Sequence, residues 1–209
     1  MTTTLQTIYD KKLVAVIRGT TEETIMPIVK ALAEGGISIL EITAETPNVL
    51  PIIEKVVRSF GDQVLVGAGT VLDPETARAT IMAGARFVFS PTVNVETIKM
   101  VKRYGAISIP GAMTPTEILT AYEHGADVIK VFPANVLGPG FIKDVHGPLP
   151  QVPLMPTGGI HLENIKEYFN KGAVAAGLGG ALVPSRQPVD EASLQLLTKK
   201  AAQFVQAIQ

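Results

Sequence analysis

The segment Ala106–Pro133, AISIPGAMTPTEILTAYEHGADVIKVFP, contains the pattern that decides the fold. Two short apolar runs, beginning at Ala106 and Asp127, enclose a stretch that carries helix signals. Thr114-Pro115-Thr116-Glu117 predicts a capping box with proline in the first turn, and Gly125 stands where the helix should end. The segment therefore predicts a strand, a helix and a second strand.

The same unit recurs along the chain. Eight apolar runs rich in β-branched residues begin near Leu13, Ile37, Val64, Arg86, Ala106, Asp127, Val152 and Ala173. Successive runs start about 23 residues apart, the length of one strand with one helix. Runs such as Leu13–Ile17 and Val128–Phe132 do not alternate with polar residues, which is typical of strands buried on both faces. Eight such units predict an α/β protein with one (β/α)8 barrel domain over residues 1–209.

Helix signals also separate the other runs. Asp73-Pro74-Glu75 and Asn94 predict helix starts, and Asp190–Ile208 predicts a closing amphipathic helix. Further helix ends are predicted at Gly36, Gly84, Gly105 and Gly172. An open, doubly wound sheet is the alternative fold. It normally carries a glycine-rich fingerprint after its first strand, and Ile17-Arg18-Gly19-Thr20 does not resemble one.

The composition limits the classes of function. The 209 residues include 18 Lys and Arg and 19 Asp and Glu, which supply no basic face for nucleic acid. The chain has no cysteine, which excludes disulfides, thiolate metal sites and a cysteine nucleophile. Its first dozen residues are polar, and no apolar run approaches the roughly 20 residues of a membrane span. We therefore expect a soluble cytoplasmic protein with no membrane or nucleic-acid partner.

In such a barrel the chemistry lies at the carboxyl ends of the strands. Lys130 stands inside the apolar segment Asp127–Pro133, where an inward-pointing amine would have little water. Desolvation would lower the pKa of this amine, and a nearby cation such as Arg18 would lower it further, leaving a neutral nucleophile for a ketone. The alternatives are a lysine that extends to the rim or one that pairs with a carboxylate.

Glu41 is a lone carboxylate at the end of the apolar run that begins at Ile37. A raised pKa in a dry pocket would let it donate and accept the protons that a Schiff-base reaction must move. The alternative is a structural ion pair with Lys130 or Arg18. The two interpretations are compatible, because catalytic pairs are ion pairs in the resting enzyme.

Glycine clusters follow the last two runs, in Thr157-Gly158-Gly159-Ile160 and Gly177-Leu178-Gly179-Gly180. In barrels the backbone N–H groups of these two loops frequently form a phosphate cradle. The alternative is a pair of tight turns that need a positive φ. The three histidines, His124, His146 and His161, show no metal-ligand spacing, so no metal site is expected.

Seven motifs occur in the order and spacing of a known family. They are Lys12-Leu13-Val14-Ala15-Val16-Ile17-Arg18, Glu41-Ile42-Thr43, Gly67-Ala68-Gly69-Thr70, Ser90-Pro91, Ile109-Pro110-Gly111, Lys130-Val131-Phe132-Pro133 and Pro156-Thr157-Gly158-Gly159-Ile160. On these residues the chain resembles, over nearly its whole length, the bacterial 2-keto-3-deoxy-6-phosphogluconate (KDPG) aldolases. They are also called 2-keto-4-hydroxyglutarate (KHG) aldolases, and are small class I pyruvate aldolases.

The resemblance implies that Lys130 is the Schiff-base lysine and Glu41 the general acid and base. It implies further substrate-binding positions, which are Arg18, Thr70 and Pro91 at the pyruvate end, Thr43 and Phe132 around the pocket, and Gly158, Gly159, Gly177, Gly179 and Gly180 at the far end. The family needs no cofactor and is generally trimeric. The implied protein is therefore a cofactor-free homotrimer that binds a small 2-keto acid.

Two positions depart from the family pattern. Some members carry an arginine a few residues after the catalytic glutamate, where this chain has Glu45, and many carry a serine where this chain has Gly180. The lost hydroxyl removes one hydrogen bond to a phosphate. We expect cleavage of KDPG to pyruvate and glyceraldehyde 3-phosphate, of 4-hydroxy-2-oxoglutarate to pyruvate and glyoxylate, or of both.

Two other functions fit the same pattern. A phosphosugar isomerase or epimerase would use the same glycine loops, with Lys130 as an electrostatic group and no imine. A non-catalytic keto-acid-binding barrel would keep the pocket without turnover, although the intact pair of Lys130 and Glu41 argues against it. An isomerase conserves the carbon skeleton, whereas an aldolase splits it.

Overall fold

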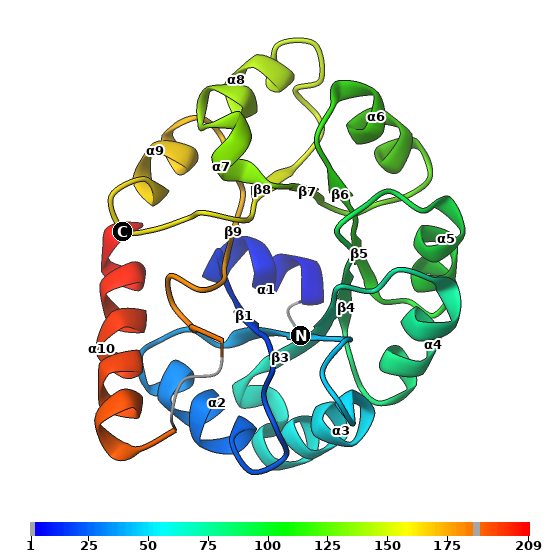
Figure 1. Ribbon diagram of the computed structural model, residues 1–209. Helices are drawn as coiled ribbons and strands as arrows, with labels where there is room; N and C mark the ends of the chain where they lie inside the picture. The colour runs from blue at the N-terminus through cyan, green and yellow to red at the C-terminus, as the bar shows by residue number, and fades with distance from the viewer. Residues whose placement is uncertain (1–2, 186–188) are drawn as a thin grey trace.

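The computed structural model describes residues 3–185 and 189–209 and shows an α/β fold in which every strand pair is parallel. Strands line the centre, and the helices other than the first lie outside them (Figure 1). The strands are β1 Leu13–Ile17, β2 Ile39–Thr43, β3 Leu65–Gly69, β4 Phe87–Phe89, β5 Ile107–Ile109, β6 Gly111–Ala112, β7 Ile129–Val131, β8 Leu154–Pro156 and β9 Ala176–Leu178.

The strands form two sheets. A curled six-stranded sheet has the order β5-β4-β3-β2-β1-β9, and a three-stranded sheet has the order β6-β7-β8. All eight predicted runs contain a strand, but the fifth run contains two, because Pro110 separates β5 from β6. Proline has no N–H to donate to the ladder. A parallel bridge between Thr157 and Gly177 joins the end of β8 to β9.

Several helices begin or end where local signals predict. Asp73 and Asn94 cap α4 and α5, and Thr114 forms a capping box with Glu117 at the start of α6. All five glycines predicted to end helices have a positive φ. The helices are α1 Thr4–Lys11, α2 Ile25–Glu34, α3 Val49–Phe60, α4 Pro74–Met82, α5 Val95–Arg103, α6 Pro115–Glu123, α7 Ala134–Leu137, α8 Gly140–His146, α9 Ile165–Asn170 and α10 Glu191–Ala207, with a short 3-10 helix at Gly61–Gln63.

A cluster of fully buried side chains fills the space inside the strands. This interior cluster consists of Ile8, Val14, Ile39, Phe87, Phe89, Ile109, Val128, Met155 and Ala175. A larger apolar cluster packs between the outer faces of the strands and the surrounding helices.

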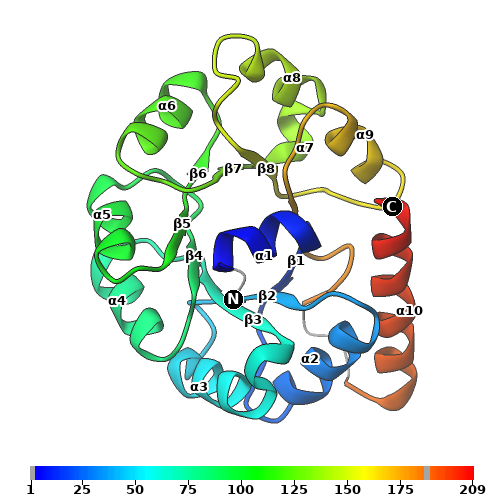
Figure 2. The ribbon, with the colours of Figure 1, turned by 180° about the vertical axis from the view of Figure 1, so that it is seen from behind.

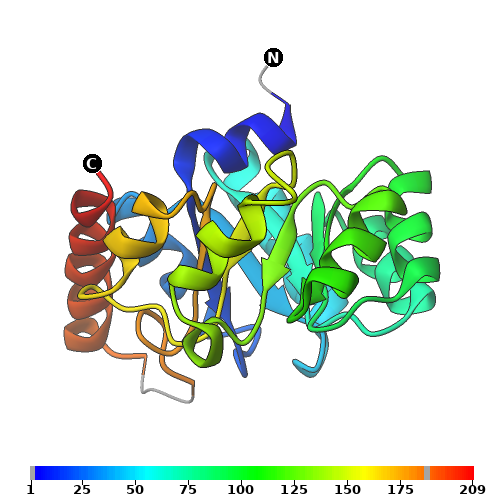
Figure 3. The ribbon, with the colours of Figure 1, turned by 90° about the horizontal axis from the view of Figure 1, so that it is seen from above.

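The first helix, α1, covers one end of the strands (Figures 2 and 3). Ile8 of α1 belongs to the interior cluster, and β1 begins two residues after α1 ends, so the covered end is the amino end of the strands. The polar residues at the carboxyl ends therefore lie on the opposite side. Within residues 3–185 and 189–209, no helix is both long enough and apolar enough to cross a membrane.

Candidate active site

Glu41, Lys130 and Thr157 form a polar layer above the interior cluster. They stand two residues after three members of that cluster, Ile39, Val128 and Met155, respectively. Because side chains of a strand alternate between its two faces, all three face the interior, nearer the carboxyl ends of the strands. Their exposed fractions are 1% for Glu41 and 5% for Lys130 and Thr157. Burying polar groups costs free energy unless they are hydrogen-bonded or paired, so three of them in one layer indicate a functional site.

The Lys130 amine lies between two aromatic rings. Its Nζ is 5.2 Å from the centre of the Phe89 ring and 4.9 Å from that of Phe132. Burial lowers the pKa of Lys130; the negative charge of Glu41 opposes this shift, and the positive charge of Arg18 adds to it. A lowered pKa increases the fraction of neutral amine, which is the form that attacks a carbonyl carbon.

Glu41 is buried at the end of β2. Burial raises the pKa of its carboxyl group, and the charges of Lys130 and Arg18 offset part of that rise. Its Oε2 atom has no hydrogen-bond partner in the part of the chain that the structure describes. A carboxyl group with a raised pKa and an unsatisfied oxygen is suited to move protons on a bound molecule.

Gly69 leaves the space that the Glu41 side chain occupies. A Cβ atom at Gly69 would overlap the carboxylate of Glu41. The two strands are paired here in register, with Glu41 opposite Gly67 and Thr43 opposite Gly69. Gly69 thus acts on the site through Glu41, a contact that the motif alone did not reveal.

Replacing Gly69 with alanine should displace the Glu41 carboxylate. We expect activity to fall about 100-fold or more, as for loss of a general acid and base, with a stability cost of about 1–3 kcal/mol from overpacking. Steady-state kinetics and thermal unfolding would measure both. The matched control is Gly140→Ala, because a Cβ atom there meets nothing within 4 Å. Equal activities of the two variants would contradict this role of Gly69.

Arg18 lies at the end of β1 and is held from two sides. Its Nη1 pairs with Oε1 of Glu45, and its Nη2 donates to Oγ1 of Thr70 at 3.3 Å. Thr70 has a φ of 54°, which is strained for a β-branched residue. Such strain is often kept at functional sites, where it costs about 1–3 kcal/mol.

The other predicted pocket residues, Thr43, Pro91 and Phe132, differ in their burial and in their contacts. Thr43 is fully buried, and its hydroxyl is within 3.4 Å of the Ile17 carbonyl and of Thr46 Oγ1, so its bonds are internal. Pro91 is half-buried in the loop after β4. Phe132 lies between the Lys130 amine and Gly158, where a Cβ atom would lie 3.4 Å from the Phe132 ring.

The five predicted glycines follow β8 or belong to β9 and its following loop. Gly158 and Gly159 have φ values of 93° and 71°, and a side chain at Gly159 would overlap Asn135. Gly177 packs against Thr157, whereas Gly179 and Gly180 face open space. Among the described residues, the N–H groups of Gly159, Gly179 and Gly180 donate no hydrogen bond.

Thr157 lies in the motif Pro156-Thr157-Gly158-Gly159-Ile160, but the sequence did not indicate a role for its side chain. Its Oγ1 is buried and has no hydrogen-bond partner among the described residues. The alternation from the apolar Met155 could have indicated that Thr157 faces the interior. The structure thus adds one hydroxyl group to the layer of Glu41 and Lys130.

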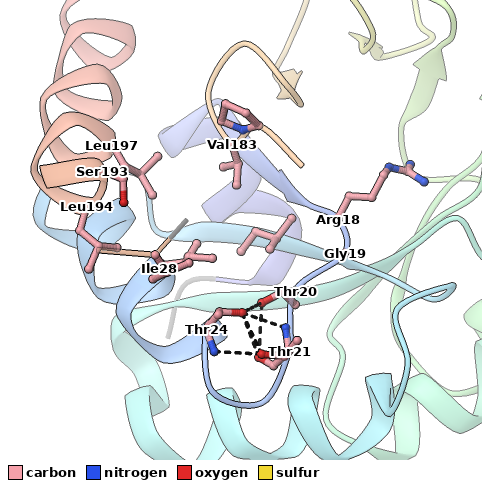
Figure 4. Close-up of a pocket in the computed structure, with 13 residues that line it drawn as sticks. Arg18, Gly19, Thr20, Thr21, Thr24, Ile28, Val183, Ser193, Leu194 and Leu197 are labelled. Carbon is pink, nitrogen blue, oxygen red and sulfur yellow. Dashed lines mark hydrogen bonds between the residues drawn. The ribbon is translucent and has the colours of Figure 1, made fainter. Parts of the chain in front are cut away.

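A cavity of about 110 Å³ lies between the loop after β1, α2 and α10, and none of Glu41, Lys130 and Thr157 lines it (Figure 4). Apolar side chains, among them Ile28, Leu194 and Leu197, form part of its wall. The threonines Thr20, Thr21 and Thr24 form another part. The Arg18 side chain points away from these residues. Among the described residues, no three His, Asp or Glu side chains are placed to hold a metal ion.

Comparisons with known proteins agree with this geometry. Residues 5–199 match the model of the family "KDPG and KHG aldolase". The chain is 35% identical over 196 residues to the 2-dehydro-3-deoxy-6-phosphogalactonate aldolase of Escherichia coli (strain K12), with 93% of each chain covered. It is also 35% identical over 196 residues to a 2-dehydro-3-deoxy-phosphogluconate aldolase of Pseudomonas aeruginosa, covering 92% of this chain and 88% of that protein.

A solved structure shows the same likeness. KDPG aldolase from Legionella pneumophila, with pyruvate captured at low pH as a covalent carbinolamine intermediate, has a TM-score of 0.87 and 30% identity, and the match covers 95% of this chain and 96% of that one. The family model and these relatives span nearly the whole sequence that carries the buried lysine, the buried glutamate and the glycine loops. The chain therefore belongs to the KDPG and KHG aldolase family.

Proposed function

We propose that this protein is a class I aldolase that cleaves a 4-hydroxy-2-keto acid to pyruvate and an aldehyde. The observation that carries the proposal is the buried Lys130 amine, with a lowered pKa, in the same interior layer as the buried Glu41 carboxyl. The Legionella relative captured pyruvate as a covalent carbinolamine, and attack of an amine such as that of Lys130 on the C2 carbonyl of pyruvate gives such an adduct.

The reaction begins with attack of neutral Lys130 Nζ on C2 of the substrate. The resulting carbinolamine loses its hydroxyl as water, with Glu41 donating the proton, and becomes an iminium ion. The C3–C4 bond then breaks, its electron pair forms the enamine, and the C4 hydroxyl proton passes to Glu41 directly or through one water. The aldehyde leaves, C3 takes up a proton, and water releases pyruvate from Lys130. The iminium nitrogen is the electron sink, so the proposal needs no cofactor or metal.

The remaining predicted residues complete the proposed pocket. Arg18, Thr70 and Pro91 would bind the pyruvate end, since they surround the ends of β1, β3 and β4. Thr43 and Phe132 would shape the pocket walls. Thr157 would add a hydroxyl group that can hydrogen-bond a substrate oxygen, because its own oxygen lacks a partner among the described residues.

The far end of the substrate is proposed to be a phosphate. The N–H groups of Gly159, Gly179 and Gly180 donate no bond within the described chain, and such groups bind anions. Gly158 and Gly177 support these loops by packing against Phe132 and Thr157. The two relatives with equal identity act, by their names, on phosphogalactonate and phosphogluconate derivatives, so identity alone does not select the sugar. Cleavage of 4-hydroxy-2-oxoglutarate is the second candidate activity.

Replacing Gly180 with serine should strengthen phosphate binding. A Cβ atom at Gly180 meets nothing within 4 Å, so the loop can accept the side chain. One added hydrogen bond of about 0.5–1.5 kcal/mol should lower the KM for KDPG by about 2- to 12-fold and leave the KM for 4-hydroxy-2-oxoglutarate unchanged. Kinetics with both substrates would show this, with Gly180→Ala as the control that lacks the hydroxyl. Equal changes for both substrates would exclude a phosphate at this loop.

The proposed function is tested by trapping the imine. The protein is incubated with pyruvate and borohydride, and the added mass is located by peptide mass spectrometry beside a known aldolase. We expect reduced pyruvate on Lys130 and splitting of the substrate into pyruvate and an aldehyde. A product that keeps the whole carbon skeleton, without an adduct, would favour an isomerase or epimerase. Ligand-induced stabilisation without turnover would favour a keto-acid-binding barrel.

We also propose the architecture in which the enzyme works. Residues 1–209 would form one closed (β/α)8 barrel, a proposal supported by the single proline between β5 and β6 and by the Thr157–Gly177 bridge. The family resemblance supports a homotrimer, which light scattering would test. Charged, phosphorylated sugar acids do not cross a bilayer unaided, so the proposal places the enzyme in the cytoplasm.

A further inference from the structure

Glu45, Arg18 and Thr70 form a bridge across three neighbouring strand ends. They lie in the loops after β2, β1 and β3, respectively, and these strands are adjacent in the sheet. The guanidinium group of Arg18 contacts both of the other side chains. The backbone supports the bridge, because the N–H of Ala44 donates to the carbonyl of Gly69 at 2.7 Å, next to Glu45 and Thr70.

The bridge orients Arg18 more than it stabilises the fold. The side chains of Arg18 and Glu45 are 49% and 41% exposed, and ion pairs at such positions add little to stability. An arginine side chain without partners samples many rotamers, and ordering it on ligand binding is costly. Glu45 and Thr70 remove that cost in advance.

Arg18 keeps donors available for an anion. A guanidinium group has five N–H donors, and the described contacts use one from each Nη atom. A carboxylate takes two donors in a fork geometry. The Arg18 side chain points away from the threonines of the cavity beside it (Figure 4), and its positive charge acts on both Glu41 and Lys130, so the guanidinium group lies near these two residues.

We propose that Glu45 is a positioning residue for the keto-acid substrate: it holds Arg18 so that the guanidinium group receives the substrate carboxylate above Lys130. The inference rests on the proposed aldolase function. Glu45 also repels an entering carboxylate, but the Glu45 side chain is 41% exposed, so solvent and salt weaken this repulsion. Orientation of Arg18 is therefore the larger effect of Glu45.

The test measures the pyruvate concentration that gives half-maximal borohydride trapping on Lys130. Pyruvate is used because it carries the carboxylate and lacks the far end of the substrate. Glu45→Ala should raise this concentration about 3- to 10-fold and leave the maximal trapping rate within 2-fold. Glu45→Gln keeps an oxygen acceptor and should restore the concentration to within about 2-fold of the unmodified protein.

A double-mutant cycle shows whether Glu45 acts through Arg18. Arg18→Ala should raise the half-maximal concentration at least as much, and Glu45→Ala should add no further change in that background. The matched control is Glu54→Ala, which removes the acid of an exposed pair with Arg58 on α3 and should leave trapping unchanged.

Four results would overturn the inference. A lower half-maximal concentration in Glu45→Ala would make Glu45 a competitor of the substrate for Arg18. An unchanged value, or an effect that persists in the Arg18→Ala background, would separate Glu45 from carboxylate binding. Absence of an adduct in the unmodified protein would remove the aldolase function together with this inference, whereas a normal adduct with an unresponsive Glu45 would remove the inference alone.

Discussion

Replacing Lys130 with methionine is expected to lower aldol cleavage by about 10⁴-fold or more, because no other group in the layer can form the imine. Methionine has nearly the volume of lysine, so the space between Phe89 and Phe132 stays filled. The substitution removes a favourable charge beside Glu41, which raises the pKa of that carboxyl further and so favours its neutral form. The fold should therefore persist. Activity assays and thermal unfolding would be measured on the same preparation.

The matched control for Lys130 is Lys99→Met on the exposed face of α5, where the lysine pairs with Glu96. This variant should keep full activity and the pyruvate adduct. Lys130→Met should lose the adduct as well as the activity. A Lys130→Met protein that is folded and retains more than a small fraction of activity would refute the assignment of the nucleophile.

Replacing Glu41 with glutamine is expected to slow turnover by about 10²- to 10⁴-fold, the usual contribution of a general acid and base. The amide keeps the shape of the side chain in the space left by Gly69, so the geometry should be preserved. Pyruvate should still be trapped on Lys130, more slowly, because Glu41 moves protons and does not form the bond. Near-normal turnover would make Glu41 a structural residue.

The pH dependence of trapping gives a second measure of Glu41→Gln. The negative charge of Glu41 raises the pKa of Lys130, so its removal lowers that pKa. The neutral amine then forms at lower pH. In a plot of trapping rate against pH, the rising limb should therefore shift to lower pH. Glu54→Gln on α3 should leave the limb in place. An unchanged limb, or a shift to higher pH, would contradict this effect of the Glu41 charge on the pKa of Lys130.

Local features of the fold could be predicted because they depend on residues within one turn. The capping box of Thr114 and Glu117, the caps of α4 and α5 and the positive φ of the helix-ending glycines all followed from short sequence signals. The eight apolar runs located the strands because each run is likewise a local stretch of sequence. The division of the fifth run at Pro110 was missed, although proline itself was the available signal.

Without the family resemblance, the sequence singled out only the most unusual residues of the candidate site. Lys130 and Glu41 are ionisable groups inside apolar runs, and their burial confirms that they do not extend to the rim. Thr157 was missed because threonine is common at strand ends and its unpaired hydroxyl is visible only in the folded chain. The contact between Gly69 and Glu41 was missed for a similar reason, since it joins residues of two strands.

The sequence by itself determined the order of strands and helices, the places of Lys130 and Glu41 in the strands, and the family. Only the tertiary structure decided that Glu45 contacts Arg18, which is 27 residues away, and that Thr70 completes their bridge from a third strand. The physical reason is that strand pairing sets which distant loops adjoin. Burial and neighbouring charges, which shift the pKa values of Lys130 and Glu41, likewise exist only when those strands are assembled.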